Sequence, residues 1–226
     1  MVVIEKILAK SEVNTFRQTL NSANWLDGKS TAMGMAANVK NNYQADPNDK
    51  LVVELTNILL SKMGHSPKLV SAALPHKIFP PCFNKYGKGE TYGYHVDAAI
   101  MRLPDRQDVI RSDVSMTVFL SEPDEYEGGE LVVATDFGEQ RVKLKAGDAV
   151  VYPSSSLHQV TPVQSGERMA AICWMQSMIA DSNVRKTLFD LDSTIQGCIA
   201  KEQVDREELD KLHNVYHNLI RHFTHI

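Results

Sequence analysis

The sequence predicts an α+β fold in which an antiparallel β core lies between two helical regions. Three regions with different hydrophobic patterns follow one another along the 226 residues. Apolar residues recur at helical spacing up to residue 76, short β-branched segments follow over 77–178, and helical spacing returns over 179–226. The chain therefore divides into an N-terminal support region, a β core and a C-terminal helical appendage.

The N-terminal region, 1–76, opens with a short strand-like segment and contains two predicted helices. The first lies in SEVNTFRQTLNSANW, takes Ser11 as its N-cap and repeats apolar residues near helical spacing. The second covers Asp49 to Met63, with Gly64 as its stop. We expect this region to pack on the β core.

The β core is indicated by short segments that alternate or are rich in β-branched residues, such as DVSMTVFLS, GELVVAT, QRVKLKA and DAVVYPS. Gly, Pro, Asp and Ser separate them at close intervals, which favours an antiparallel barrel or jelly roll. We expect this section to end near Ser177.

Two segments with helical periodicity form the C-terminal region, NVRKTLFDLDSTIQGCIA and REELDKLHNVYHNLIRHF. The second begins with an acidic turn, which suits the positive end of a helix dipole. Their apolar stripes predict a docking surface, either on the β core of the same chain or on a second copy. A homo-oligomer formed through these helices is therefore one expectation.

Composition excludes several classes of partner. The net charge of −4 and the pI near 6.1 give no electrostatic reason to expect nucleic acid or an anionic membrane. The three cysteines, Cys82, Cys173 and Cys198, fit neither a disulfide framework nor a zinc knuckle, which indicates a reducing compartment. Without a signal-peptide pattern or a long apolar run, the sequence predicts a cytoplasmic protein.

A candidate metal site starts at YGKGETYGYHVDAAI, where His95 and Asp97 are two positions apart. On a strand these side chains project from one face, while Val96 packs on the other. Imidazole and carboxylate together suit first-row divalent metals. His158, in VVYPSSSLHQVTPV, would complete a facial triad that leaves positions open for Fe(II) chemistry.

Each of these residues also has a simpler interpretation. A lone His-x-Asp pair is usually a surface pair, and His158 alone fits a loop histidine. Arg168, in VQSGERMAAICWMQS, alone fits a salt bridge to a neighbouring acid. Because the PVQSG turn separates His158 from Arg168, strand parity does not establish that they share a pocket.

The motifs, in the order in which they occur, resemble those of a known protein family. HVD, then GGEL, then AGDAVVYPSSSLHQVTPVQSGERMAAICWMQS is similar to the Fe(II)- and 2-oxoglutarate-dependent dioxygenases of the prolyl 4-hydroxylase-like group. Within that group the chain most closely resembles the bacterial PKHD-type hydroxylases, over almost its whole length, including NWLDGKSTAMG and VYHNLIRHF. The resemblance implies a double-stranded β-helix, the jelly-roll or cupin-like core.

The resemblance also implies roles for five residues. His95, Asp97 and His158 become the iron ligands. Arg168 becomes the partner of the distal carboxylate of 2-oxoglutarate, and Tyr86 matches a tyrosine whose hydroxyl often joins that arginine. An arginine fork suits this task because it grips a carboxylate through two N–H bonds.

Three positions refine the comparison with the family. Related prolyl hydroxylases often have a second tyrosine where this chain has Phe119, so the cosubstrate must rely on other groups there. Trp174 matches a family aromatic but fits a core residue equally well. Halogenating relatives replace the carboxylate of Asp97 with a small residue, so its presence argues for hydroxylation.

The implied activity is hydroxylation of an unidentified amino-acid, peptide or iron-uptake-related substrate, with O2 consumed and succinate and CO2 released. Ascorbate is a further candidate cofactor. One alternative is a non-oxidative cupin-type metal enzyme, although such sites usually use an H-x-H pattern, which is missing, and have no need of Arg168. The other is a binding module that senses metal or 2-oxoglutarate.

Two further segments have open interpretations. The stretch from Arg102 to Asp113 forms either a lid over the pocket or a solvated loop, which we favour for most of its charges: Arg102, Asp105, Arg106, Asp108, Arg111 and Asp113. In the tail, His213 and His217 stand one helical turn apart, with His222 and His225 nearby. A solvated helix face is the favoured interpretation there, and adventitious nickel or zinc binding is the alternative.

Overall fold

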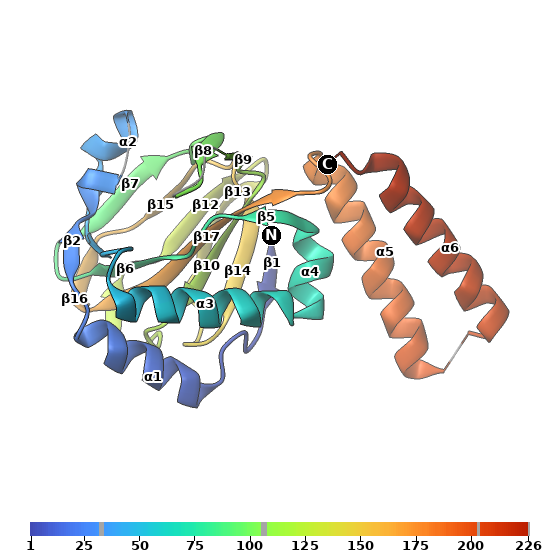
Figure 1. The fold of residues 1–226 in the computed structure, drawn as a ribbon, viewed down its shortest axis with the longest axis horizontal. Coiled ribbons are helices and arrows are strands. Elements are labelled where there is room, and N and C mark those ends of the chain that lie inside the picture. The colour runs from blue at the N-terminus through green and yellow to red at the C-terminus, as the bar shows by residue number, and fades with distance from the viewer. Residues whose placement is uncertain (32–33, 105–107, 203, 226) are drawn as a thin grey trace.

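A computed structural model describes residues 1–31, 34–104, 108–202 and 204–225. Its centre is an eight-stranded sheet (Figure 1). The strand order is β1 (Val2–Ile4), β14 (Ala149–Pro153), β10 (Val114–Phe119), β17 (Arg168–Ser177), β6 (Cys82–Tyr86), β4 (Tyr43–Ala45) and β2 (Trp25–Asp27), and β5 (Pro75–Ile78) pairs with β17. Strands from the N-terminal region thus occupy both ends of this larger sheet.

A smaller, five-stranded sheet faces it. Its order is β13 (Gly138–Val142), β12 (Leu131–Thr135), β15 (His158–Val160), β7 (Thr91–His95) and β3 (Lys40–Asn41). Two short pairs complete the β structure: β11 (Tyr126–Gly128) with β16 (Val163–Gly166), and β8 (Ile100–Arg102) with β9 (Val109–Arg111).

The strands pair antiparallel throughout the described residues. After β10 the chain passes to β12 and β13 in the smaller sheet, returns to β14 in the larger sheet, crosses again to β15 and comes back to the larger sheet in β17. This repeated passage between two facing sheets is the predicted double-stranded β-helix, so the expected fold class is confirmed.

Helices cover the outer face of the larger sheet. They are α1 (Lys10–Asn21), α3 (Lys50–Gly64) and α4 (Pro67–Ala73) (Figure 1). Alternate strand residues, among them Met116 of β10 and Cys173 of β17, join Phe16 and Leu59 of the helices in one buried apolar cluster. Because side chains alternate along a strand, the intervening residues of β10 and β17 face the smaller sheet.

Two helix starts differ in how well the sequence predicts them. The first helix begins at Lys10 with Ala9 as N-cap, so the prediction of Ser11 is wrong. The reason is that the Glu12 carboxylate accepts the Ala9 N–H at 2.7 Å, which moves the start towards the N-terminus. The start of α3 is confirmed, since the Asp49 side chain caps the Leu51 N–H, although the helix includes Gly64.

Three short helices of the described residues were not predicted. They are α4, a 3-10 helix η1 (Gly28–Thr31) and α2 (Met35–Asn38). The sequence does hold a signal for α4, because Ser66 caps the Leu69 N–H and Pro67 follows at the first helical position.

The C-terminal region forms two helices, α5 (Ser182–Lys201) and α6 (Arg206–Phe223), which stand side by side at the end of the β core opposite α2 and β2 (Figure 1). Leu188 and Tyr216 of this hairpin share a buried apolar cluster with Leu74 and Ile179. The Arg185 guanidinium donates to the Ile179 and Ala180 carbonyls at 2.6 and 2.7 Å. The hairpin therefore docks on its own chain, and self-association stays a prediction.

Several expectations concern features outside the core. All three cysteines are free thiols. In the part of the chain that the structure describes, no helix has both the length and the apolar character needed to cross a membrane. The division of the chain at residues 76 and 178 stays a prediction.

The proposed lid segment is built largely on the β8–β9 hairpin, while Asp105 and Arg106 lie outside the described residues. Arg111 Nε donates to Asp113 Oδ1 at 2.6 Å, and Lys77 Nζ lies 2.7 Å from Asp108 Oδ2. These charges thus have protein partners, and a lid function stays a prediction.

Candidate metal centre

The inner face of the larger sheet carries polar and aromatic side chains. Ser115 is paired with Trp174, and Arg168 is paired with Tyr86. Each of these four residues is an odd number of positions along its strand from a residue of the helix-facing cluster, so each points to the other side of the sheet. The alternation therefore brings the candidate residues of β17, β10 and β6 into the space between the two sheets.

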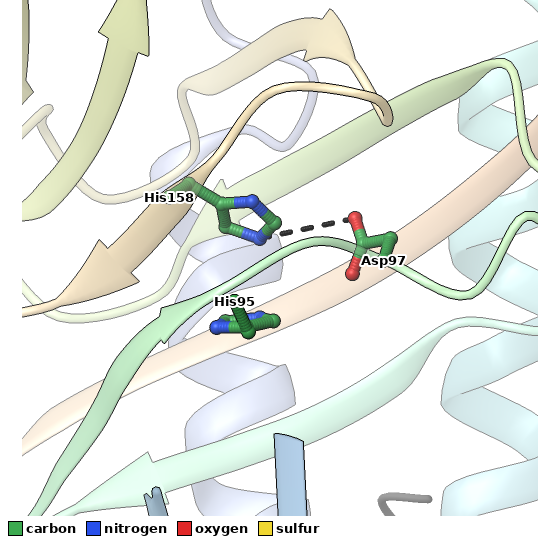
Figure 2. A group of neighbouring side chains, drawn as sticks. All are labelled: His95, Asp97 and His158. Carbon is green, nitrogen blue, oxygen red and sulfur yellow. Dashed lines mark ion pairs between the residues drawn. The ribbon is translucent and has the colours of Figure 1, made fainter. Parts of the chain in front are cut away.

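His95, Asp97 and His158 come together in this space (Figure 2). His95 ends β7, His158 begins β15, and the two residues are direct cross-strand partners. One ligand atom from each of the three side chains lies within 4.8 Å of the other two. His158 Nε2 is 3.8 Å from Asp97 Oδ2. The cluster offers two imidazoles and a carboxylate to a single ion.

Backbone carbonyls orient both imidazoles. His95 Nδ1 lies 2.8 Å from the Gly93 carbonyl oxygen, and His158 Nδ1 lies 2.9 Å from that of Ser156. These contacts assign the proton to Nδ1 in each ring, so that Nε2 keeps its lone pair. The Nε2 atom of each ring, which is free to bind a metal, therefore points away from its own strand.

Asp97 is held from the opposite sheet. The Ser115 hydroxyl of β10 donates to Asp97 Oδ2 at 2.6 Å and lies 2.7 Å from the Ser154 hydroxyl. Strand β7 ends at His95, so Asp97 lies beyond it, and Val96 is 49% exposed. The prediction that Val96 packs on the other face is therefore wrong, because the chain leaves the sheet at that point.

The site keeps His95 neutral. Burial, aided by His158, lowers the pKa of His95 from 6.5 to about 4. The Tyr92 ring stacks on the His95 ring with centroids 3.5 Å apart, and Tyr152 packs edge-on against His158 at 5.2 Å. At neutral pH the imidazole is therefore unprotonated and able to ligate.

Arg168 is fully buried, and its three guanidinium nitrogens have no hydrogen-bond partner among the described residues. Its guanidinium carbon lies 5.2 Å from the centroid of the Tyr86 ring and 5.5 Å from that of Phe119. The contact with Tyr86 is thus to the face of the ring. An unpaired buried charge is strongly unfavourable, so this one indicates an anionic ligand.

Arg168 and the metal cluster are linked by aromatic residues. Tyr152 packs with Phe119, which contacts Arg168, and also against His158. Tyr92 packs against the apolar cluster that contains Tyr86, and its ring stacks on that of His95. One wall of aromatic rings therefore runs from the buried cation to the three candidate ligands.

Two further hydroxyls in this interior were not predicted. Tyr126 Oη and Thr117 Oγ1 are buried and have no hydrogen-bond partner among the described residues. Burial raises the pKa of Tyr126, while the charge of Arg168 and an interaction of its guanidinium with the phenol oppose the rise, so the two groups are neighbours although they do not reach hydrogen-bond geometry. Tyr126 thus offers a hydroxyl near the arginine where Phe119 offers none. Thr117 was open to prediction, because it shares the parity of Phe119 in DVSMTVFLS.

The tail histidines form no comparable group. The rings of His213 and His217 have centroids 6.2 Å apart. Elsewhere in the ranges that the structure describes, no three His, Cys, Asp or Glu side chains converge as the residues at 95, 97 and 158 do. Metal binding by the tail stays a prediction.

Two family models match the chain. The model of the 2OG-Fe(II) oxygenase superfamily matches residues 81–176, which include every candidate site residue predicted from the sequence. The model of the PKHD-type hydroxylase C-terminal domain matches residues 182–225, which correspond to the α5–α6 hairpin.

Similar proteins extend these matches. A PKHD-type hydroxylase of Shewanella frigidimarina is 65% identical over the whole of both chains, and one of Alteromonas mediterranea is 60% identical over the same extent. Among solved structures, a Pseudomonas putida prolyl-4-hydroxylase covers 78% of this chain and 91% of its own, with a TM-score of 0.52 and 20% identity, and so supports the fold. The chain therefore belongs to the PKHD-type hydroxylase family and is an Fe(II)- and 2-oxoglutarate-dependent dioxygenase that acts as a hydroxylase.

Proposed function

We propose that His95, Asp97 and His158 bind the Fe(II) ion and that Arg168 binds the distal carboxylate of 2-oxoglutarate. The donor set fits the ion, because two imidazole nitrogens and a carboxylate oxygen within 4.8 Å match the preference of Fe(II) for a facial triad. The fully buried Arg168 side chain fits the cosubstrate, because its unpaired guanidinium requires an anion. That unpaired guanidinium is the single observation that carries the proposal.

Residues of this chain hold the proposed metal ligands and Arg168 in position. The Nδ1–H groups of His95 and His158 donate to backbone carbonyls, so the rings hold one orientation and one tautomer. Ser115 fixes Asp97 from the opposing sheet. The hydroxyls of Tyr126 and Thr117 provide unused polar groups in the interior that Arg168 shares. Tyr86 contributes the aromatic face that supports the guanidinium.

The chemistry belongs to the bound groups. Fe(II) supplies O2 activation coupled to decarboxylation of 2-oxoglutarate, which yields succinate and CO2 and places one oxygen atom in a substrate C–H bond. The buried rings of Tyr86, Phe119 and Tyr152 restrict the access of water to this reaction. The carboxylate of Asp97 occupies a ligand position and so supports hydroxylation rather than halogenation.

A peptide or small molecule is the proposed substrate class. A Trichoplax adhaerens prolyl hydroxylase, solved with a peptide fragment of hypoxia inducible factor, has a TM-score of 0.54 to this chain at 14% identity, which bears on the fold alone. A cupin-type enzyme without 2-oxoglutarate would leave Arg168 unused, so that alternative is not favoured. Ascorbate as a cofactor and a cytoplasmic location stay predictions.

The test has a binding arm and a turnover arm. Anaerobic addition of Fe(II) and 2-oxoglutarate to the wild-type protein should produce a metal-to-ligand charge-transfer band, and aerobic incubation should release succinate. Asp97→Ala should lose both signals while keeping the far-UV circular dichroism of the wild type. Exposed Asp124→Ala is the matched control. Undiminished succinate release by a folded Asp97→Ala protein would remove the ligand assignment.

A further inference from the structure

A second buried cation lies beside the metal cluster. Lys40 of β3 is 7% exposed, and its ammonium donates to Thr31 Oγ1 at 2.8 Å. No carboxylate of the described residues forms an ion pair with it. Three N–H groups thus have one neutral hydrogen-bond acceptor between them.

This arrangement is costly unless an anion completes it. Removing an ammonium group from water is unfavourable, and one hydroxyl compensates only a small part of that cost. Burial accordingly lowers the pKa of Lys40, and the opposing influence of Cys82, Asp27 and Asp97 offsets only part of that effect. The Thr31 hydroxyl also contacts the Gly28 carbonyl and Gln44 Oε1, so it is shared among several polar groups.

Lys40 is one ring away from the candidate iron ligands. It is the cross-strand partner of Tyr92, and its Nζ lies 5.3 Å from the centroid of that ring. The Tyr92 ring also stacks on the ring of His95, one of the candidate iron ligands. A group bound by Lys40 would therefore lie next to the reaction centre.

Neighbouring amides also have unused polar atoms. Lys40, Asn42 and Gln44 alternate with exposed residues and so share one face of the chain where it passes from the smaller sheet to the larger. Both polar side-chain atoms of Asn42 are buried without a hydrogen bond among the described residues, although Asn42 lies close enough to the Tyr86 phenol to oppose the rise in pKa that burial causes there. Asn84 Oδ1, opposite Gln44, is likewise buried without a hydrogen bond among the described residues. Lys40, Asn42 and Asn84, which we call the Lys40 cluster, thus bring a cation, one amide donor and two amide acceptors to this part of the interior.

The two buried cations call for two anions. Arg168 contacts the rings of Tyr86 and Phe119, whereas Lys40 contacts Tyr92, so they share no aromatic partner. The distal carboxylate of 2-oxoglutarate satisfies only one of them. We propose that the Lys40 cluster binds a carboxylate of the substrate to be hydroxylated, with the two asparagine amides contacting an amide group next to that carboxylate.

This inference rests on the proposed function and narrows the substrate to carboxylates of amino-acid or peptide type. A minimal probe with this chemistry is N-acetylglycine, and N-acetylglycinamide is its uncharged counterpart. The protein is loaded with Mn(II), which does not turn over, and saturated with 2-oxoglutarate. Paramagnetic relaxation of the probe protons then reports binding near the metal.

The wild-type protein should relax the protons of N-acetylglycine saturably and those of N-acetylglycinamide at least about tenfold less. Lys40→Met should remove the saturable relaxation while leaving the affinity for 2-oxoglutarate within about twofold of the wild type. Lys85→Met is the matched control, because that ammonium lies over the rings of Trp25 and Tyr43. If Lys40→Met does not fold, Lys40→Gln provides the same comparison.

Three results would overturn the inference. They are equal relaxation of both probes by the wild type, unchanged N-acetylglycine relaxation in a folded Lys40 variant, and a loss of 2-oxoglutarate affinity in that variant as large as in Arg168→Met. The last would place Lys40 in the cosubstrate site. Failure of the proposed function is separately visible, because Mn(II) binding measured by electron paramagnetic resonance would then survive Asp97→Ala.

Discussion

The two faces of the larger sheet differ in chemistry although the same strands form both. Towards the helices, Met116 of β10 and Cys173 of β17 lie in a continuous apolar cluster. Towards the smaller sheet, the neighbouring residues Thr117 and Trp174 have buried polar atoms without partners among the described residues. One face thus provides stability, and the other holds unsatisfied groups for ligands.

The two faces contain two kinds of buried residue that the exposed fraction of a side chain does not distinguish. Met116 and Arg168 are both 0% exposed, yet one is satisfied by its surroundings and the other is not. Substitutions on the outer face should therefore affect the free energy of unfolding, and substitutions on the inner face should affect binding.

Met116→Ala should have the largest effect on stability. Loss of the side chain leaves a cavity between the sheet and the helices, and the free energy of unfolding should fall by about 2–5 kcal/mol. The KM for 2-oxoglutarate should not change. Urea unfolding and succinate assays measure the two quantities. Thr117→Val is the control on the adjacent inner position, and an equal loss of stability in that variant would break the distinction between the faces.

Arg168→Met should show the opposite pattern. Loss of a charge-assisted pair of hydrogen bonds to a carboxylate costs about 3 kcal/mol, so the KM for 2-oxoglutarate should rise roughly a hundredfold. The stability of the protein without 2-oxoglutarate should not fall, because the variant removes an unpaired buried charge. Arg141→Met, at an exposed residue paired with Glu130, is the control. A normal KM in the Arg168 variant would contradict the cosubstrate assignment.

Ser115→Ala tests support from the inner face without touching a ligand. Ser115 donates to Asp97 at 2.6 Å, and loss of such a contact typically weakens metal affinity about ten- to a hundredfold. Fe(II) titration under anaerobic conditions measures it. Ser177→Ala removes an equally buried hydroxyl, which donates to the Leu74 carbonyl, and should bind Fe(II) normally. Similar affinities in the two variants would exclude this role.

Lowering the pH should reduce the free energy of unfolding of the metal-free protein, because His95 is kept unprotonated in the folded state. Its pKa is about 4 in the folded chain and 6.5 when unperturbed, so the unfolded chain takes up the proton first as pH falls. The contribution is complete above pH 6.5 and is lost towards pH 4, which amounts to about 2 kcal/mol between pH 7 and pH 5. Urea unfolding at these two pH values measures it, and His95→Gln should reduce the difference. An unchanged difference in that variant would assign the acid sensitivity to other groups.

Strong periodicity made most of the fold predictable. The segments around β10, β12 and β14 and the helices α3, α5 and α6 follow directly from alternating or helical spacing. The short strands β2, β3 and β4 have two or three residues each, too few for a period to appear. Their pairing is set by tertiary contacts, which is why no sequence pattern predicted that Lys40 is buried beside the candidate metal site.

Prediction of the site depended on motifs rather than on geometry. HVD and the later histidine identified the metal cluster, although Asp97 lies beyond the strand on which its parity was argued. The PVQSG turn hid the relation of His158 to Arg168, because the two residues belong to different sheets. Tyr126 lies in the short β11–β16 pair, whose place near Arg168 no sequence spacing encodes.

The direct pairing of His95 with His158 ties metal affinity to strand alignment. The two strands share few residue pairs, and the pairing is irregular beyond the histidines. A slip by one residue would turn one imidazole to the opposite side of the sheet. Molecules with that register error would keep most of their secondary structure but would lack one metal ligand. The fraction of a refolded sample that binds a divalent ion would therefore measure how many molecules paired these two strands in the correct register.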